Sequence, residues 1–385
     1  MRKTAAVVIA VVSTLVIVAC SSGASTSSSA STSGSAAATA GSGTANGADI
    51  AAATAYQAQF LSPPTSIGIS TPLTSKPTAG KLIVGLETGT GGSSEVLGEA
   101  WAQAAAALGW KYKTLISGGT PTTQQAAMES AIQLNPAGIV TAGIPNSTLS
   151  AQLVLAKQKG IWVNSSGNPS PPSGAMYDTS IEGPAQFVQA GKMVAAYVVA
   201  HSNGKAVIQE FSLPVYPILT AFDTAFVAAI KQWCPACKVT QNPQTAADIG
   251  TTTPQAVVSA VTRNPATNWL IFDLGDLATG VNAALSAAGL HGLHIGGQAA
   301  DTPNITALKN GTQDVWTAYS EAVAGYRQLD SLARKFEGMP ILNTPVPAQL
   351  ITPQNVNSLV VDSQGNYIGV ANFRSQFLTL WHVNS

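Results

Sequence analysis

From Lys81 onward, short apolar runs alternate with longer segments whose apolar residues recur every three or four positions. The first cycle predicts a strand over 82–86, a helix over 95–108 and a strand over 112–116. Strict alternation of this kind is typical of a parallel sheet covered by helices. The pattern also predicts a helix over 122–134, a strand over 138–141, a helix over 147–159 and a strand over 161–164.

A second series of the same kind begins near Tyr177. In each series one helix stops at Asn-Pro before a buried strand, at Asn135 and at Asn264, because proline biases the preceding residue toward extended geometry. We therefore predict an α/β fold with two doubly wound, Rossmann-like lobes. The second series is predicted to contain helices over 184–201, 216–233, 254–263 and 278–288, and strands over 206–211, 238–240, 269–272 and 293–296.

The part of the chain after the second series is less regular. It predicts a strand over 314–318, an amphipathic helix over 321–336 and an extended, proline-punctuated segment over 341–352. The tail over 359–385 is predicted either as a terminal strand and helix or as a surface wrap.

Residues 1–19 have the pattern of a secretory signal peptide. Arg2 and Lys3 precede an apolar run over 5–19 that is too short for a stable membrane span. The following Cys20 completes an Ile-Val-Ala-Cys sequence that resembles the bacterial lipobox. The resemblance implies that Cys20 carries lipid and that the exported protein is held by lipid alone on the outer face of the cytoplasmic membrane. An ordinary signal peptide with an incidental cysteine is the alternative.

The segment over 20–79 is rich in Ser, Thr, Ala and Gly, and Asp49 is the only charged residue between positions 21 and 75. Such a composition buries too little apolar surface to order a chain, so we predict a flexible tether. Its stiffer end, 56–75, contains proline and larger apolar residues, and packing of this part on the folded domain is left open.

With Cys20 assigned to lipid, Cys234 and Cys237 remain as an even pair in an oxidising compartment, and we predict a local disulfide between them. Their spacing also matches a thioredoxin-like redox motif, but that motif opens a helix, whereas this pair follows one. A zinc site is disfavoured because no second cysteine pair or suitably spaced histidine pair completes it.

The formal net charge is zero, which argues against nucleic acid as a partner. The loop over 88–94 lies between a strand and a helix and is rich in Gly and Ser. It lacks the Gly-Lys-Ser/Thr of a Walker loop and the third glycine of a dinucleotide fingerprint, so we predict no nucleotide and no other cofactor. A loop that lines a ligand cleft is the preferred interpretation, and a tight turn without a ligand is the alternative.

Between Lys81 and Thr352 the order and punctuation of these elements resemble the type I periplasmic binding proteins, in the ribose- and galactose-binding group. The resemblance lies in the following features: Leu-Gly-Trp at 108–110, Gln-Lys-Gly-Ile-Trp-Val at 158–163, Tyr177-Asp178 with Gly183, Asn264-Pro265, the run 276–280, Ala288-Gly289, Ile-Gly-Gly at 295–297 and the run 319–325.

The resemblance implies two lobes that close on a ligand and are joined by three crossing strands, near Asp178, Tyr319 and Pro345. The N-terminal lobe then comprises 80–178 plus 319–345, and the C-terminal lobe comprises 179–318 plus 346–385.

Position by position, the resemblance also implies which residues bind the ligand. They start the first helix, follow the fourth strand, occupy the family's charged positions, or lie at a crossing. Asp276 is placed equally well as a helix cap. The expected ligand-binding residues are Ser93, Ser94, Ser166, Asn168, Phe222, Asp276, Gln298 and Tyr319.

The family's charged positions read Gly167, Phe222 and Gln298 here. We therefore expect a small, neutral, modestly polar ligand, sugar or sugar-like by family default, held more by apolar contact with Phe222 and Tyr319 than by charge. The resemblance implies a monomer that delivers solute to the membrane permease of an ABC importer. A ligand-sensing lipoprotein that reports to a membrane receptor is one alternative. A secreted hydrolase is another, but the sequence contains no nucleophile elbow or acid–base set for it.

Overall fold

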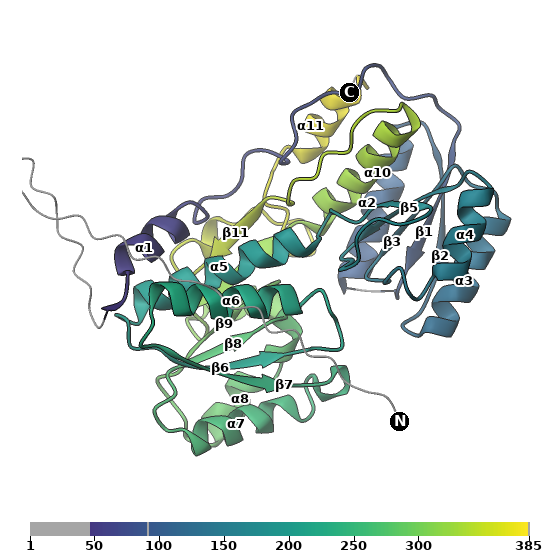
Figure 1. Cartoon of the computed structure of the whole chain (residues 1–385). Helices are drawn as coiled ribbons and strands as arrows, with labels where there is room; N and C mark the ends of the chain where they lie inside the picture. The colour runs from purple at the N-terminus through teal and green to yellow at the C-terminus, as the bar shows by residue number, and fades with distance from the viewer. Residues whose placement is uncertain (1–46, 91, 384–385) are drawn as a thin grey trace, which may run out of the picture. The chain divides into compact units, whose positions relative to one another are not determined.

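The computed structural model describes residues 47–90 and 92–383. The alternation of strands and helices from Lys81 onward is confirmed, and it builds two lobes, each with its own parallel sheet (Figure 1). The described residues belong to one compact unit. The predicted signal peptide and Cys20 lie outside them.

The sheet of the N-terminal lobe is wholly parallel, in the order β2-β1-β3-β4-β5. Ile83 and Val84 pack into different cores, because successive side chains of a strand point to opposite faces. Helices α2 (Gly92–Ala107) and α10 (Glu321–Phe336) cover one face, and α3 (Pro121–Gln133) and α4 (Ser150–Gln158) cover the other. The strands are β1 (Leu82–Glu87), β2 (Lys111–Ile116), β3 (Gly138–Ala142), β4 (Trp162–Ser166) and β5 (Met176–Asp178).

The sheet of the C-terminal lobe has the order β11-β10-β9-β8-β6-β7, and β11 is antiparallel to β10. In Figure 1 helices α5 and α6 lie above this sheet and α7 and α8 below it. The strands are β6 (Val207–Ser212), β7 (Lys238–Pro243), β8 (Trp269–Phe272), β9 (His294–Gly297), β10 (Val315–Tyr319) and β11 (Ala348–Ile351). The helices are α5 (Pro184–His201), α6 (Thr220–Trp233), α7 (Thr253–Arg263), α8 (Val281–Ala287) and α9 (Thr302–Lys309).

The predicted bounds of α5, β8 and α10 agree with the structure. Helix α6 begins at Thr220 rather than at 216, because Pro214 and Pro217 hold the preceding residues in turns. Gly280, in the left-handed region at φ 78°, separates a short 3-10 turn from α8 and shortens the helix predicted over 278–288. Within the described part of the chain, no helix is long and apolar enough to cross a bilayer.

Three internal segments of the chain pass between the lobes. These are the segment from β5 to α5, the junction of β10 with α10, and the approach to β11, where Val346 still packs in the N-terminal lobe. Two terminal segments cross as well. We call residues 47–79 the N-terminal strap and residues 352–383 the C-terminal strap.

The straps differ from the sequence predictions. The part of the predicted tether that the structure describes is folded: it contains helix α1 (Ile50–Ala58), and Ile67 and Leu73 are buried core residues. The tail assigned to the C-terminal lobe returns instead to the N-terminal lobe, where α11 (Phe373–Leu380) packs against α10. In both cases the chain is ordered by apolar contacts with segments distant in sequence, which a local composition does not reveal.

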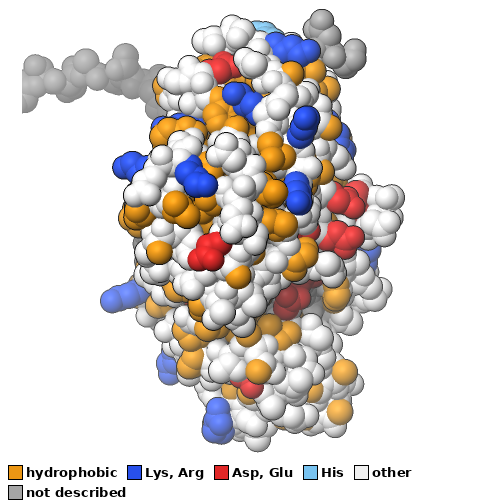
Figure 2. Space-filling model, turned by 90° about the vertical axis from the view of Figure 1, so that its right-hand side faces the viewer, with side chains coloured by type: hydrophobic (Ala, Val, Ile, Leu, Met, Phe, Trp, Pro, Cys, Tyr) orange, Lys and Arg blue, Asp and Glu red, His pale blue; other side chains and the backbone are white. Residues whose placement is uncertain are grey.

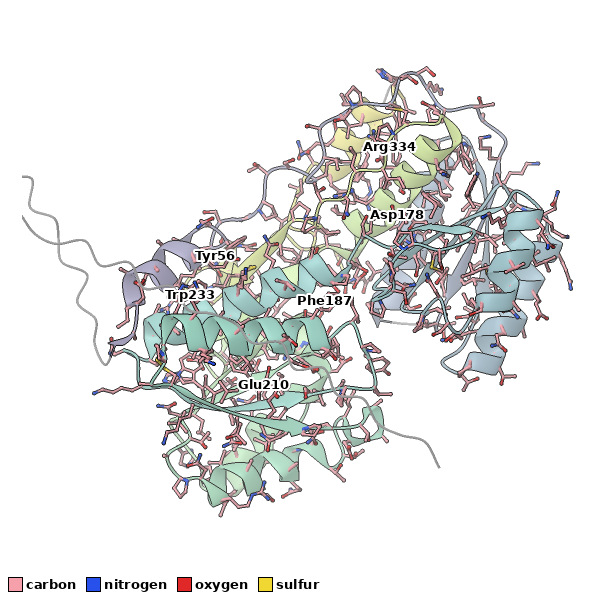
Figure 3. All side chains as sticks on the ribbon, in the orientation of Figure 1. Tyr56, Asp178, Phe187, Glu210, Trp233 and Arg334 are labelled. Atoms are coloured by element: carbon pink, nitrogen blue, oxygen red, sulfur yellow. A yellow bond between two sulfur atoms is a disulfide. The ribbon has the colours of Figure 1, made fainter. Side chains whose placement is uncertain are left out.

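On the C-terminal lobe, α1 packs against α5 and α6. The ring of Tyr56 lies 5.3 Å from that of Trp233 between centroids (Figure 3), and the Asp49 amide donates to the Trp233 carbonyl at 2.7 Å. The two straps meet beside β11, where the Leu61 carbonyl accepts hydrogen bonds from Gln349 at 3.0 Å and Asn355 at 2.7 Å.

On the N-terminal lobe the straps meet again. The Leu73 amide donates to the Leu380 carbonyl at 2.8 Å, and Gln376 accepts from the Ile67 amide at 3.1 Å. The ring of Trp381 stacks on Tyr326 of α10, with centroids 5.8 Å apart and planes 6° from parallel. The straps are therefore joined to each other in both lobes.

Helix α10 is buried along most of its length although it carries two arginines. Arg334 is paired with Asp330, Nε to Oδ2 at 2.6 Å, and also donates to the Thr71 carbonyl of the N-terminal strap at 2.5 Å. The other oxygen of Asp330 accepts from Trp381 Nε1 at 2.9 Å. Arg327 donates to the Ile67, Leu342 and Thr344 carbonyls. Both straps thus supply hydrogen-bond partners to buried charges of α10.

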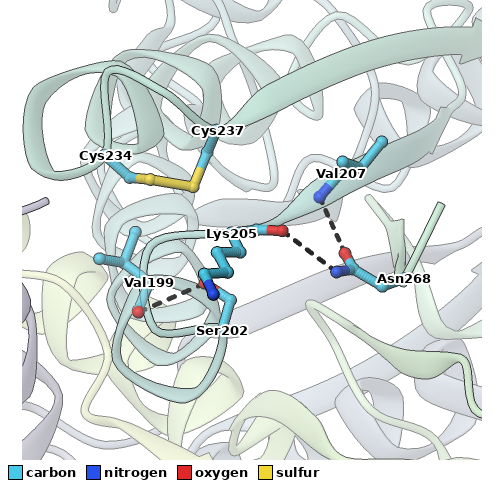
Figure 4. The surroundings of a disulfide bond; sticks show 7 residues. All are labelled: Val199, Ser202, Lys205, Val207, Cys234, Cys237 and Asn268. Atoms are coloured by element: carbon cyan, nitrogen blue, oxygen red, sulfur yellow. Dashed lines mark hydrogen bonds between the residues drawn. A yellow bond between two sulfur atoms is a disulfide. The ribbon is translucent and has the colours of Figure 1, made fainter. Parts of the chain in front are cut away.

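The predicted disulfide between Cys234 and Cys237 is present in the structure, immediately after α6 (Figure 4). The Cys237 amide also donates to the Cys234 carbonyl at 3.0 Å. Nearby, the Asn268 side chain bridges the Val207 amide at 2.8 Å and the Lys205 carbonyl at 3.1 Å. The disulfide therefore closes the turn between α6 and β7 on the side where β6 begins.

Three carboxyl groups are buried together in the C-terminal lobe, on Glu210, Asp223 and Asp273. Burial, followed by the nearby Asp223 charge, raises the pKa of Glu210 to about 9. Burial likewise raises the pKa of Asp223 to about 7 and that of Asp273 to about 8. The folded lobe therefore favours the protonated form of Glu210 and Asp273 at neutral pH, and Asp223 is divided about equally between its two forms there.

The Asp330–Arg334 pair gives a prediction for stability. Asp330→Ala leaves a buried guanidinium without its carboxylate, and we expect a loss of about 3–5 kcal/mol in unfolding free energy. Urea denaturation followed by tryptophan fluorescence measures the loss. Glu99→Ala, at an exposed position of α2, is the control and should change stability by less than about 0.5 kcal/mol. Equal stability of the two variants would contradict a structural role for the pair.

The buried Glu210 predicts how stability depends on pH. Because its folded pKa is raised, the folded protein holds a proton that the unfolded chain releases above about pH 4.5, so stability falls as pH rises toward about 9. Within that window the fall is at most about 1.4 kcal/mol per pH unit. Glu210→Gln should therefore raise the melting temperature at pH 8.5 and change it little at pH 5, whereas the exposed Glu99→Gln should do neither. A Glu210→Gln effect that is the same at both pH values argues against this account.

Candidate ligand-binding cleft

Two adjoining cavities, of about 560 and 540 Å³, are each lined by residues from both lobes. They lie at the carboxyl ends of the parallel strands, where open α/β sheets bind ligands. Both are lined by Thr88, Ser93, Ser94 and Glu321, so they form one continuous cleft. On the face shown in Figure 2, acidic side chains are visible in and around a hollow.

The predicted ligand loop after β1 does line the cleft. Ser94 closes this loop: its Oγ accepts from the Gly89 amide and from Thr88 Oγ1, each at 3.3 Å. Ser93 is exposed at the start of α2 and lines both cavities. Ser94 Oγ also donates to the Gly89 carbonyl at 3.3 Å, so its hydroxyl is used within the loop, and Ser93 is the exposed hydroxyl that the loop presents to the cleft.

Of the other predicted residues, Asp276 and Tyr319 line the first cavity together with Ser93 and Ser94. Asp276 follows β8, and Tyr319 ends β10 at the crossing into α10. These four of the eight predicted residues are brought together by the structure. Their binding of a ligand stays a prediction.

Ser166, Asn168 and Gln298 do not line either cavity and are buried. The Asn168 amide donates to the Ile144 carbonyl at 2.9 Å and to Asn146 Oδ1 at 3.1 Å, so it holds neighbouring loops. Gln298 donates to the Asp273 carbonyl at 2.5 Å. The prediction that Asn168 and Gln298 face the ligand is wrong for this structure, because each bonds a backbone carbonyl of its own lobe. Ser166 does not line the cleft itself, but it lies within hydrogen-bonding reach of Glu182, which does.

Phe222 is also misplaced by the prediction. Its side chain is fully buried in the core of the C-terminal lobe and stacks on Phe226, with centroids 5.9 Å apart. The two residues are one helical turn apart on α6, and that face of the helix packs inward. Phe222 therefore supplies no wall for a ligand.

The apolar wall of the cleft comes from other residues. Val215 and Tyr216, with 62% and 46% of their surfaces exposed, line the second cavity opposite Leu97 and Trp101 of α2. Tyr319, which the sequence predicts to be part of this apolar wall, lines the first cavity. The cleft thus combines an apolar side with a polar one.

From the sequence, few charged groups are expected in the cleft, and this expectation is wrong. Glu182 and Glu321 lie at two of the lobe crossings, within hydrogen-bonding reach of each other. Burial, the facing Glu182 and the nearby Asp301 raise the pKa of Glu321 well above its usual range. Burial also raises the pKa of Glu182, and its hydrogen bond to Glu321 partly offsets the shift.

A second acidic contact lies in the first cavity. Asp301 and Asp276 share a hydrogen bond, and burial together with that contact raises the pKa of Asp301 to about 8. Tyr319 is close enough for Glu321 and Glu182 to raise its pKa further, beyond the effect of burial. Among the described residues, no group of three or more His, Cys, Asp or Glu side chains is arranged to hold a metal ion.

One local signal distinguishes Glu182. Its backbone φ is 52°, in the left-handed region that non-glycine residues seldom adopt, and such residues cluster at functional sites. This signal exists only in the structure. In the sequence, Glu182 lies in an ordinary loop and Glu321 opens an amphipathic helix, so neither stands out.

Comparison with known proteins gives one family match, to the periplasmic binding protein domain, over residues 89–339. No curated protein matches the sequence.

Solved structures with the same fold include an ABC sugar transporter subunit from Rhodobacter sphaeroides, with a TM-score of 0.64 and 18% identity, covering 72% of this chain and 99% of that one. A periplasmic ribose ABC transporter structure from Conexibacter woesei has a TM-score of 0.66 and 14% identity, covering 74% and 96%. An ABC transporter solute binding protein from Agrobacterium vitis with bound allitol has a TM-score of 0.62 and 18% identity, covering 72% and 97%. At these identities the likeness concerns the fold. Because the family match extends over about two thirds of the sequence, this chain belongs to the periplasmic binding protein family.

Proposed function

We propose that this protein is the extracytoplasmic solute-binding component of an ABC importer and that one small solute binds between its lobes. The observation that carries the proposal is the cleft, which both lobes line at the carboxyl ends of their strands, in a chain of this family. Its volume suits a ligand of the size of a sugar. A membrane permease is the proposed partner of the loaded protein.

A sugar-like ligand is supported by the polar side of the cleft. Ser93, Ser94 and Thr88 offer hydroxyls, and the carboxyl groups accept hydrogen bonds from a hydroxylated solute. The related structures named above include one described as a periplasmic ribose ABC transporter and one described with bound allitol. Exposed Tyr216 and Val215 supply a surface for the less polar face of such a ring.

Mass spectrometry of the purified protein tests the proposal. After mild denaturation we expect release of one small molecule per protein, and Ser93→Trp should reduce that amount at least about tenfold, because the indole fills space shared by both cavities. Ser286→Trp, on an exposed position of α8, is the matched control and should retain the solute. If the wild-type protein retains nothing and binds none of a broad panel of sugars, polyols and their amino derivatives, the proposed function is wrong. Full retention by Ser93→Trp would place the site elsewhere.

We also propose that the mature protein begins at lipidated Cys20 and is anchored on the outer face of the cytoplasmic membrane. The support is the signal-like N-terminus and its Ile-Val-Ala-Cys ending. Mass analysis of the membrane fraction should show Cys20 as the first residue with added acyl mass, and Cys20→Ala should abolish that mass. Ser21→Ala should keep it. A mature N-terminus at another residue, without acyl mass, contradicts the anchor.

A further inference from the structure

All ionisable acid and base side chains that line the cleft are acidic. Five carboxyl groups from both lobes line its two cavities, and among the described residues no Lys, Arg or His lines either cavity. The five carboxyl groups belong to Glu87, Glu182, Asp276, Asp301 and Glu321. The buried carboxylate of Asp330 in α10, by contrast, has a guanidinium partner at 2.6 Å. The acidic cleft has no such partner along its walls.

Glu182 gives an independent sign that a ligand group is expected. Only 4% of its surface is exposed, and its Oε1 atom is buried without a hydrogen-bond partner although the residue lines the second cavity. A buried polar atom left without a partner is costly, and native proteins rarely tolerate one without a reason. The side chains within hydrogen-bonding reach of this carboxyl group are Glu321, another carboxyl group, and the neutral Ser166 hydroxyl, so neither supplies a positive charge.

The acidic groups form a connected path along the cleft. Glu321 lines both cavities, contacts Glu182 on one side and lies within electrostatic range of Asp301 on the other. Asp301 in turn contacts Asp276. The raised pKa values of Glu321 and Asp301 have the same cause: the ionised form of each of these two groups is destabilised by burial and by a neighbouring carboxyl group.

A neutral sugar supplies hydroxyl donors to these groups but does not reduce their mutual repulsion. A protonated amine does both, since an ammonium group offers three donors and a positive charge that favours the ionised carboxylates. We propose, on the basis of the solute-binding function above, that the ligand is a hydroxylated amine, with its ammonium group held by Glu182 and Glu321 and its hydroxyls by the Ser93 side of the cleft.

Matched pairs of probes test this inference on the whole mature protein, after bound solute has been removed by reversible unfolding. The pairs are D-glucosamine with D-glucose, D-galactosamine with D-galactose, and N-methylglucamine with sorbitol, and calorimetry measures their binding. In at least one pair the amine should bind about tenfold or more tightly than its neutral partner. Glu321→Gln and Glu182→Gln should reduce this preference to within about twofold, and Glu99→Gln, outside the cleft, should leave it unchanged.

The retained solute gives a second measurement that separates the two proposals. If it contains an amine and competes with the amine probes, the inference is supported. If it is a neutral or anionic molecule, or if a neutral probe binds as tightly as its amine partner, the inference is wrong while the solute-binding function stands. If the protein retains no solute and binds no member of any pair, both proposals fail.

Discussion

The structure depends on one constraint, the burial of α10. This helix carries five polar side chains into the interior: Arg327, Gln328, Asp330, Ser331 and Arg334. Each needs a partner there, because a buried polar group without a hydrogen bond is costly and an unpaired buried charge costs several kcal/mol. The partners come from almost every part of the N-terminal lobe. Gln328 bonds Trp101 of α2 at 2.8 Å and the Thr141 carbonyl of β3 at 3.0 Å, and Ser331 bonds Asp178 at the end of β5 at 2.5 Å. Arg334 also donates to Thr71 of the N-terminal strap, and Arg327 donates to Ile67 of that strap and to Leu342 and Thr344 of the third crossing. Helix α10 therefore makes hydrogen bonds to the sheet, to the first crossing and to both straps.

The same arrangement explains where the cleft carries its charge. Glu182 precedes α5 and Glu321 begins α10, so both stand where the chain passes from one lobe to the other. Both line the cleft, and their carboxyl groups lie within hydrogen-bonding reach of each other.

Local patterns predicted the regular elements well, because strand alternation and helical spacing are properties of neighbouring residues. They located β8, α5 and α10, the disulfide and the ligand loop with Ser93 and Ser94. They failed where a distant contact decides. Helix α1 has the small-residue composition of the predicted tether, and its order comes from packing on α5 and α6. For the cleft, the resemblance predicted Phe222 as a ligand-binding residue, but the side of α6 on which it lies packs inward, and its ring stacks on Phe226. Glu182 and Glu321 were missed because only the fold brings them together.

The straps have a practical consequence for where this protein can be cut. The family match ends at residues 89 and 339, yet α1, α11 and most hydrogen-bond partners of Arg327 and Arg334 lie beyond those limits. A recombinant fragment trimmed to the family boundaries would expose the aromatic face of Tyr326, remove the carbonyl partners of Arg327 and leave Arg334 with Asp330 alone. Domain boundaries drawn from relatives are thus too narrow here. The smallest piece expected to fold alone runs from about Asp49 to Trp381, nearly the whole exported chain.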